Sequence, residues 1–179
     1  GGDEQFVKSK ASGKIYQGIY GNNIIFSTEL EGGILTTNKG YSKVVDRFVL
    51  GGRSFRGFKY SGIGPRELSG GQYTIPLGGE KYAIARFAAS FPLGLPRELG
   101  LYGSVFAEAG SLWDIKTDPN VAGLSDKIAL RDRALRTSIG FAMNWETPIG
   151  PLQFNWSRPQ KYLNADSLEY FSLNLATRF

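Results

Sequence analysis

The last nine residues of the chain alternate between apolar and polar side chains: Phe171-Ser172-Leu173-Asn174-Leu175-Ala176-Thr177-Arg178-Phe179. Successive side chains of a β-strand point to opposite faces, so a period of two residues predicts a strand with one apolar face. On that face we expect Phe171, Leu173, Leu175 and Phe179, with Thr177 among them. The smaller and more polar side chains occupy the other face.

Six stretches upstream also carry a strand pattern, namely residues 5–19, 23–36, 81–91, 101–113, 138–145 and 152–157. The first is the least regular, and Lys8, Lys10 and Lys14 share its polar face. No stretch has a convincing helical period. The sequence therefore predicts an all-β, antiparallel fold of about seven strands.

The links between these strands alternate in length. Residues 21–22, 92–100 and 147–151 are short, whereas residues 38–79, 114–135 and 158–168 are long. Short turns at one end and long loops at the other are typical of an outer-membrane β-barrel, with its turns in the periplasm and its loops outside the cell. A soluble β-sandwich also alternates, but its polar face usually carries more charge than the Ser, Asn, Gly and Ala found here. We therefore expect a transmembrane barrel wall.

The composition excludes several classes of function. The chain of 179 residues has neither cysteine nor histidine, which removes disulfides, Cys-ligated metals and the commonest general base. Its net charge of +5 is scattered, which disfavours nucleic-acid binding. No apolar run reaches the roughly 20 residues of a membrane-spanning helix, and the polar start shows no signal peptide. We expect no enzyme, no cofactor and no metal. We also expect the cations Lys127, Arg131, Arg133 and Arg136 to form a solvated extracellular face.

Four segments, in the same order, resemble the C-terminal region of the BamA family of outer-membrane assembly factors. The first, residues 46–58, contains Gly51-Gly52-Arg53-Ser54-Phe55-Arg56-Gly57-Phe58 and is similar to the family's "RGF" loop. The second is residues 105–113, around Glu108. The third is residues 138–152, with a Thr-Pro-Ile-Gly-Pro hairpin, and the fourth is the aromatic C-terminus. Residues 1–45 fit only by their strand pattern.

The resemblance implies a barrel of sixteen strands, of which this chain would be a C-terminal segment lacking the periplasmic POTRA domains. Residues 38–79 would form the sixth extracellular loop and carry the RGF motif. The open strand edges of such a segment would have to be covered, because lipid cannot satisfy backbone polar groups.

The resemblance also assigns roles to particular residues. The loop would fold into the lumen, where Arg56 meets an acid on the wall, and Glu108 matches that acid in place of the family's usual Asp. A second family acid is expected near Ala88 and is absent, so docking would be weaker or another acid would contribute. The remaining loop residues of the docking motif are Gly51, Gly52, Phe55, Gly57 and Phe58.

The last strand would carry two functions. Phe171, Leu173, Leu175 and Phe179 resemble the C-terminal sorting signal of Gram-negative barrels, although Ala176 stands where a glycine is usual. Residues 168–179 would also form one side of the seam where the barrel closes.

The function implied is assembly or insertion of outer-membrane β-barrel proteins by strand-edge templating, without covalent chemistry. The expected partners are outer-membrane lipid, unfolded outer-membrane protein clients and, through upstream domains, the lipoproteins of an assembly complex. Two alternatives remain: a pore of the same superfamily that secretes a polypeptide, and a passive structural barrel. The expected location is the outer membrane of a Gram-negative bacterium.

Overall fold

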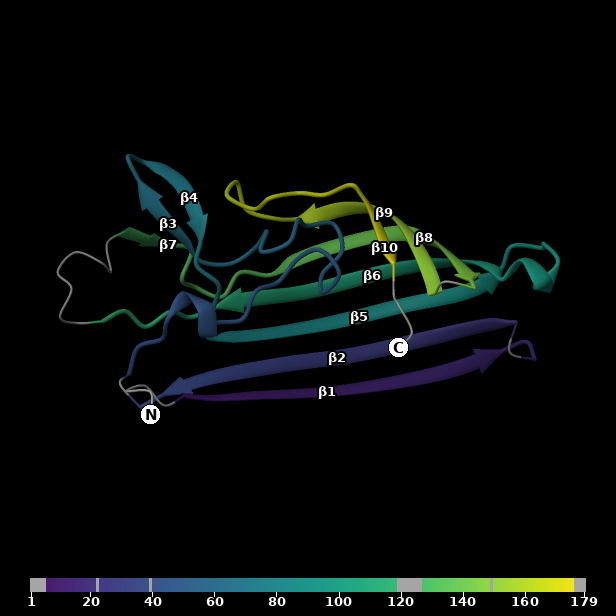
Figure 1. The fold of residues 1–179 in the computed structure, drawn as a ribbon, viewed down its shortest axis with the longest axis horizontal. Helices are drawn as coiled ribbons and strands as arrows, with labels where there is room; N and C mark the ends of the chain where they lie inside the picture. Colours follow the sequence, from purple (N-terminus) through teal and green to yellow (C-terminus); the bar gives the residue numbers. More distant parts are fainter. Residues whose placement is uncertain (1–5, 22, 39, 119–126, 149, 176–179) are drawn as a thin grey trace.

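A computed structural model describes residues 6–21, 23–38, 40–118, 127–148 and 150–175. Its main element is an antiparallel sheet of seven strands in the order β1-β2-β5-β6-β8-β9-β10 (Figure 1). These strands are β1 (Phe6–Ile19), β2 (Ile24–Thr37), β5 (Lys81–Pro92), β6 (Leu101–Trp113), β8 (Arg136–Thr147), β9 (Gly150–Lys161) and β10 (Phe171–Leu175). The prediction of about seven antiparallel strands is confirmed.

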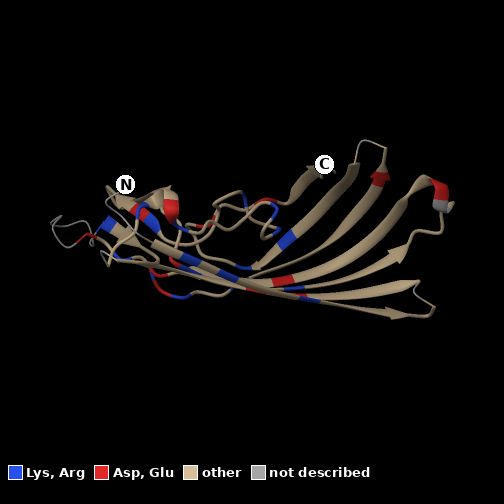
Figure 2. Ribbon diagram, turned by 60° about the horizontal axis from the view of Figure 1, so that its bottom comes forward, with Lys and Arg blue, Asp and Glu red and all other residues tan. Residues whose placement is uncertain are grey.

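Each long strand pairs with the next long strand along the chain, which is the up-and-down order of a barrel wall. The sheet is curved, and loop segments lie on its concave side (Figure 2). It is also open, because among the described residues β1 pairs only with β2 and β10 only with β9. The fold is therefore a segment of an antiparallel barrel.

The two faces of the sheet differ in the way expected of a wall in lipid. On β6, Ser104, Phe106 and Glu108 are buried on the concave side, whereas Val105, between two of them, is exposed. Large apolar side chains are exposed along the convex side, among them Phe26, Leu30, Phe87, Val105 and Ile139. A soluble sheet would hide these side chains, so the convex face is the one that contacts lipid.

Within the described parts of the links lie three short strands and the two 3-10 helices named below. A second sheet has the order β4-β3-β7, formed by β3 (Arg66–Ser69), β4 (Gln72–Pro76) and β7 (Ile128–Ala129). The helices are η1 (Val44–Asp46) and η2 (Arg97–Leu99). This small sheet was not predicted, because strands of two to five residues are too short to show a period of two.

The apolar core lies between the wall and the long link from β2 to β5. Its buried residues come from both: Leu35, Tyr82, Ile84 and Leu112 from the wall, and Phe48, Leu50, Phe55, Phe58 and Ile63 from the link. Partly buried Leu168, from the link before β10, packs against them. The long link therefore folds back onto the concave face instead of extending away from the strand ends.

Candidate functional site

The base of the long link is pinned where it leaves and re-enters the wall. Phe48 and Gly79 exchange two backbone hydrogen bonds, each of 2.9 Å. Arg47 donates from Nε to the Ser42 hydroxyl, which donates in turn to Glu80 at 2.7 Å. These contacts fix both ends of the loop, so that the segment between them is directed over the sheet.

The tip of the loop is a tight turn that glycine makes possible. Gly51 and Gly52 have φ of +123° and +59°, a region that side chains with a Cβ rarely adopt. A Cβ on Gly51 would also collide with the carbonyl of Lys59. The Ser54 hydroxyl closes the turn by donating to the Gly51 carbonyl at 2.9 Å. The turn presents the next residues, Phe55 to Phe58, to the wall.

Two phenylalanines hold this segment in the lumen. Phe55 and Phe58 are fully buried, and their ring centroids are 5.0 Å apart. Full burial of one phenylalanine side chain contributes about 1.5–3 kcal/mol. The apolar anchor is therefore strong, but it has little directional preference of its own.

The orientation of the loop on the wall is set by the pair Arg56 and Glu108. The Arg56 backbone N–H donates to one Glu108 oxygen at 2.8 Å, and its side-chain Nε donates to the other at 2.6 Å. The guanidinium also lies 3.5 Å from the centroid of the Phe106 ring, a cation–π contact. The Glu108 side chain is only 2% exposed. The structure thus brings together the two residues that the sequence analysis paired.

A row of alternating charge crosses the concave face at the height of Glu108. Strand register places Lys14 opposite Glu29, Glu29 opposite Arg86, and Arg86 opposite Glu108. Arg86 donates to Glu29 at 3.0 Å and to Glu31 at 2.8 Å, and it also donates to the Ser54 carbonyl at 2.6 Å. A wall cation therefore holds the loop beside the wall acid.

Arg86 was missed by the sequence analysis, which looked for a second acid near Ala88. Ala88 lies opposite Phe106 and carries no charge, whereas Arg86 lies two residues away on the same face of β5. The sequence does contain a pattern that could have pointed to Arg86: Lys14, Glu29, Arg86 and Glu108 alternate in charge on four successive long strands. It becomes visible only when the register between the strands is known.

Gly57 brings the loop into direct contact with β8. Its φ is +92°, and a Cβ there would lie 2.5 Å from the Ser138 hydroxyl oxygen. Its carbonyl accepts the Glu169 N–H at 3.0 Å, so the loop also pairs with the link before β10. A side chain at this position would strain the backbone and push the loop off the wall.

We therefore expect Gly57→Ala to destabilise loop docking by about 2–6 kcal/mol, the sum of the cost of a left-handed backbone and the cost of a steric overlap. Gly70→Ala is the matched control, since its φ is +59° and nothing lies within 4 Å of its Cβ. Limited proteolysis of the loop would measure docking. Equal protection in the two variants would show that the close contact with Ser138 is unimportant.

The cluster of cations expected to form a solvated face does not behave as one group. Arg136 is fully buried and donates to both oxygens of Asp166, from Nε at 3.0 Å and from a terminal nitrogen at 3.1 Å. Arg133, in contrast, is exposed. The prediction was wrong for Arg136 because the link before β10 folds over it and supplies a carboxylate.

The last strand presents its apolar side chains outward. Phe171, Leu173 and Leu175 are exposed on the convex side, while Ser172 and Asn174 are partly buried on the other. Phe179 and Ala176 lie outside the described residues. The described part of the strand therefore follows the predicted alternation.

Neither a metal centre nor a spanning helix is found in the part of the chain that the structure describes. No group of three or more acidic side chains is placed to hold a metal ion there. No helix in the same residues is long and apolar enough to cross a membrane.

An open antiparallel wall, apolar outside and lined inside by a loop on an arginine–glutamate pair, defines an outer-membrane β-barrel protein. The chain belongs to the Omp85 superfamily, whose domain model matches residues 1–179. Its relatives make it a BamA-type member and place it in the outer membrane of a Gram-negative bacterium.

Three relatives carry the name outer membrane protein assembly factor BamA. The protein of Neisseria meningitidis is 32% identical over 75% of this chain, that of Nitratidesulfovibrio vulgaris 27% over 89%, and that of Neorickettsia risticii 26% over 100%. The matched regions are 19%, 18% and 23% of those proteins, so the chain spans about a fifth of their length.

A solved structure shares the fold. The crystal structure of BamA from Haemophilus ducreyi, lacking POTRA domains 1–3, aligns with a TM-score of 0.76 at 23% identity. The alignment covers 95% of this chain and 34% of that one. The wall described above therefore corresponds to part of a known barrel.

Proposed function

We propose that this chain is a C-terminal part of the barrel of a factor that assembles outer-membrane proteins by strand-edge templating, with neither cofactor nor covalent chemistry. The observation that carries the proposal is the lumenal loop, which is docked both on the wall and on the link that leads into β10. The names of the three relatives support the same activity.

The edge of β10 has the chemistry that templating requires. The Ser157 N–H donates to the Tyr170 carbonyl at 2.8 Å, which fixes the phase of the ladder between β9 and β10. Hydrogen-bonded pairs alternate with non-hydrogen-bonded pairs in an antiparallel ladder. The backbone N–H and C=O groups of Ser172 and Asn174 therefore point toward β9, and those of Phe171, Leu173 and Leu175 point away from it. An extended client segment could pair with these outward-facing groups.

The docked loop would keep this edge in place. Backbone hydrogen bonds join Lys59 to Ser167 at 2.9 Å and Gly57 to Glu169 at 3.0 Å, so the loop is bonded to the link that leads into β10. Through Glu108 and Arg86 the same loop is held on the middle of the wall. The proposed role of the Arg56 motif is therefore to position the start of the seam strand.

The orientation and partners follow from this function. Residues 38–79 would lie on the extracellular side, unfolded outer-membrane proteins would be the clients, and assembly lipoproteins would bind other parts of the protein. Phe171, Leu173 and Leu175, with Phe179 beyond the described residues, would form the protein's own sorting signal.

Leu173→Pro tests the edge. Proline removes an N–H that faces away from β9, and edge strands tolerate it because the ladder to β9 is left intact. We expect the intact protein to fold, and its insertion of an unfolded barrel client into liposomes to slow by about tenfold or more, equivalent to one lost backbone pairing site.

Asn174→Pro is the control, since it removes an N–H that bonds to β9. We expect this variant to lose folded barrel, as judged by heat-dependent gel migration. If Leu173→Pro folds and inserts clients at the normal rate, the edge of β10 is not the template and the secretion-pore alternative gains support.

A further inference from the structure

We propose that the lipid-facing side of the wall carries a specific site for a phosphate-bearing lipid, with its acyl chain across β1, β2, β5 and β6 and its phosphate on Arg133 and Ser111. The site is separate from the docked loop and from the edge of β10. It depends only on the convex face being in lipid.

The acyl-chain part is a shallow groove of about 640 Å³ lined by small side chains. Register places Ala11, Gly32, Ala83 and Ser111 in one row across the four strands. Gly13, Leu30, Ala85 and Ala109 form the next row. Strands lie about 4.8 Å apart, so four of them give a groove about 14 Å long.

The polar end of the groove contains a hydroxyl without a partner. Ser111 is 3% exposed, and its Oγ has no hydrogen-bond partner in the described structure. It lies on the lipid-facing register of β6, in line with Val105, Ala107 and Ala109. A buried hydroxyl loses about 1–3 kcal/mol when it is left unpaired, so a ligand that accepts its hydrogen bond would be favoured.

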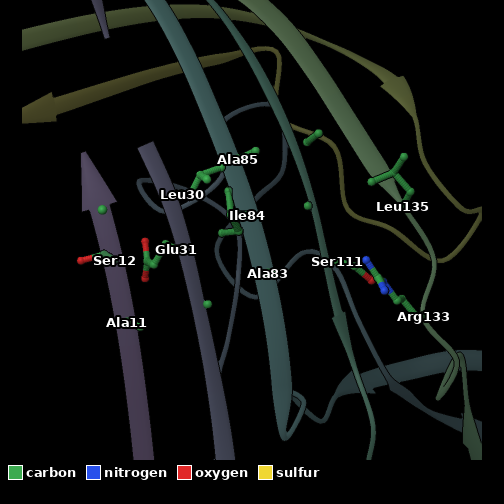
Figure 3. A pocket seen from close by; sticks show the side chains of 14 residues that line it. Ala11, Ser12, Leu30, Glu31, Ala83, Ile84, Ala85, Ser111, Arg133 and Leu135 are labelled. Atoms are coloured by element: carbon green, nitrogen blue, oxygen red, sulfur yellow. The ribbon is translucent and has the colours of Figure 1, made fainter. Parts of the chain in front are cut away.

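Arg133 supplies the charge beside this hydroxyl. Figure 3 shows the two side chains next to each other at one end of the groove. The guanidinium carbon lies 5.2 Å from the centroid of the Trp113 ring, and Arg133 is in no ion pair within the described structure. Trp113 ends β6 next to the long links, where an aromatic residue is expected at the membrane interface.

Two acidic groups near the site are already paired with other side chains. Glu31 also lines the groove, but its carboxylate accepts hydrogen bonds from Tyr82 and Arg86 on the concave side. Asp114 is paired with Lys81 at 2.8 Å. The free cation, the unpaired hydroxyl and the apolar groove together match one phosphate attached to an acyl chain. A free anion would match only the polar end.

The test uses the intact protein in detergent, with bisphosphorylated lipid A as the probe and native mass spectrometry as the readout. We expect one lipid to remain bound, and Arg133→Gln to weaken its binding by about tenfold, the effect of one charge-assisted contact. Arg158→Gln is the matched control, because Arg158 is an exposed arginine on the same face outside the groove. We expect it to bind the lipid normally.

Two further arms separate the parts of the site. Ala83→Leu would fill the groove at an exposed position and should weaken binding while circular dichroism stays unchanged. Dephosphorylated lipid A should bind at least about tenfold more weakly, and inorganic phosphate should not displace the lipid. Equal losses in Arg133→Gln and Arg158→Gln, equal binding of both lipids, or normal binding by Ala83→Leu would each overturn the proposal.

Discussion

Replacing Arg136 by alanine is expected to lower the free energy of unfolding of the barrel by about 3–5 kcal/mol. The side chains of Arg136 and Asp166 are both 0% exposed, so the pair is shielded from bulk solvent. Asp166 would then be a buried carboxylate that keeps the Leu163 N–H, at 2.7 Å, as its one hydrogen-bond donor among the described contacts. The cost comes from the uncompensated charge, and the attraction within the pair contributes less.

The measurement is urea unfolding of the intact protein in detergent, followed by tryptophan fluorescence. Lys127→Ala is the control, an exposed cation in the link that precedes β8. The double variant Arg136→Met, Asp166→Leu should recover most of the stability, because an apolar pair leaves no buried charge. If Arg136→Ala unfolds at the same urea concentration as Lys127→Ala, the pair is not buried in the protein.

Replacing Glu108 by alanine is expected to release the loop from the lumen, at a cost of about 2–5 kcal/mol for the lost partner of a buried, hydrogen-bonded charge. Both the backbone N–H and the side chain of Arg56 lose their acceptor at once. The Arg56 guanidinium would keep only the ring of Phe106, a contact worth about 0.5–2 kcal/mol. The phenylalanine anchor would remain, but without a fixed direction.

Trypsin can report this release, because it cleaves after Arg56 only when the loop leaves the wall. We expect rapid cleavage in Glu108→Ala, an intermediate rate in Glu108→Gln, which keeps the acceptor oxygen, and protection in Glu67→Ala, which lies in the small sheet. Client insertion into liposomes should fall in the same order. Complete protection of the loop in Glu108→Ala would show that the apolar anchor alone docks it.

The sequence predicted the pair Arg56–Glu108, but it did not predict the row of alternating charges on the wall to which Glu108 belongs. Arg56 and Glu108 were paired by their resemblance to family motifs, and the structure brings them together at 2.6 Å. Arg86 also holds the loop, by donating to the Ser54 carbonyl, but it belongs to no family motif. Its role depends on the register that sets it opposite both Glu29 and Glu108.

The small sheet and the buried Arg136 show the same limit. The paired residues Arg66 of β3 and Ala129 of β7 are 63 positions apart, and β7 has two residues, so no local sequence pattern predicts their pairing. Arg136 has the appearance of a surface cation in a basic cluster. Only the fold places Asp166 beside it.

The alternation that ends the chain, and the six similar stretches before it, determined the strands and the all-β class by themselves. A strand needs only its own residues to define its two faces, and a period of two is visible in any such stretch. The tertiary structure decided which charges meet, which loop fills the lumen and which face of the wall holds an unpaired hydroxyl. These features depend on register and on long-range contacts, in which residues distant in sequence become neighbours and water is excluded from between them.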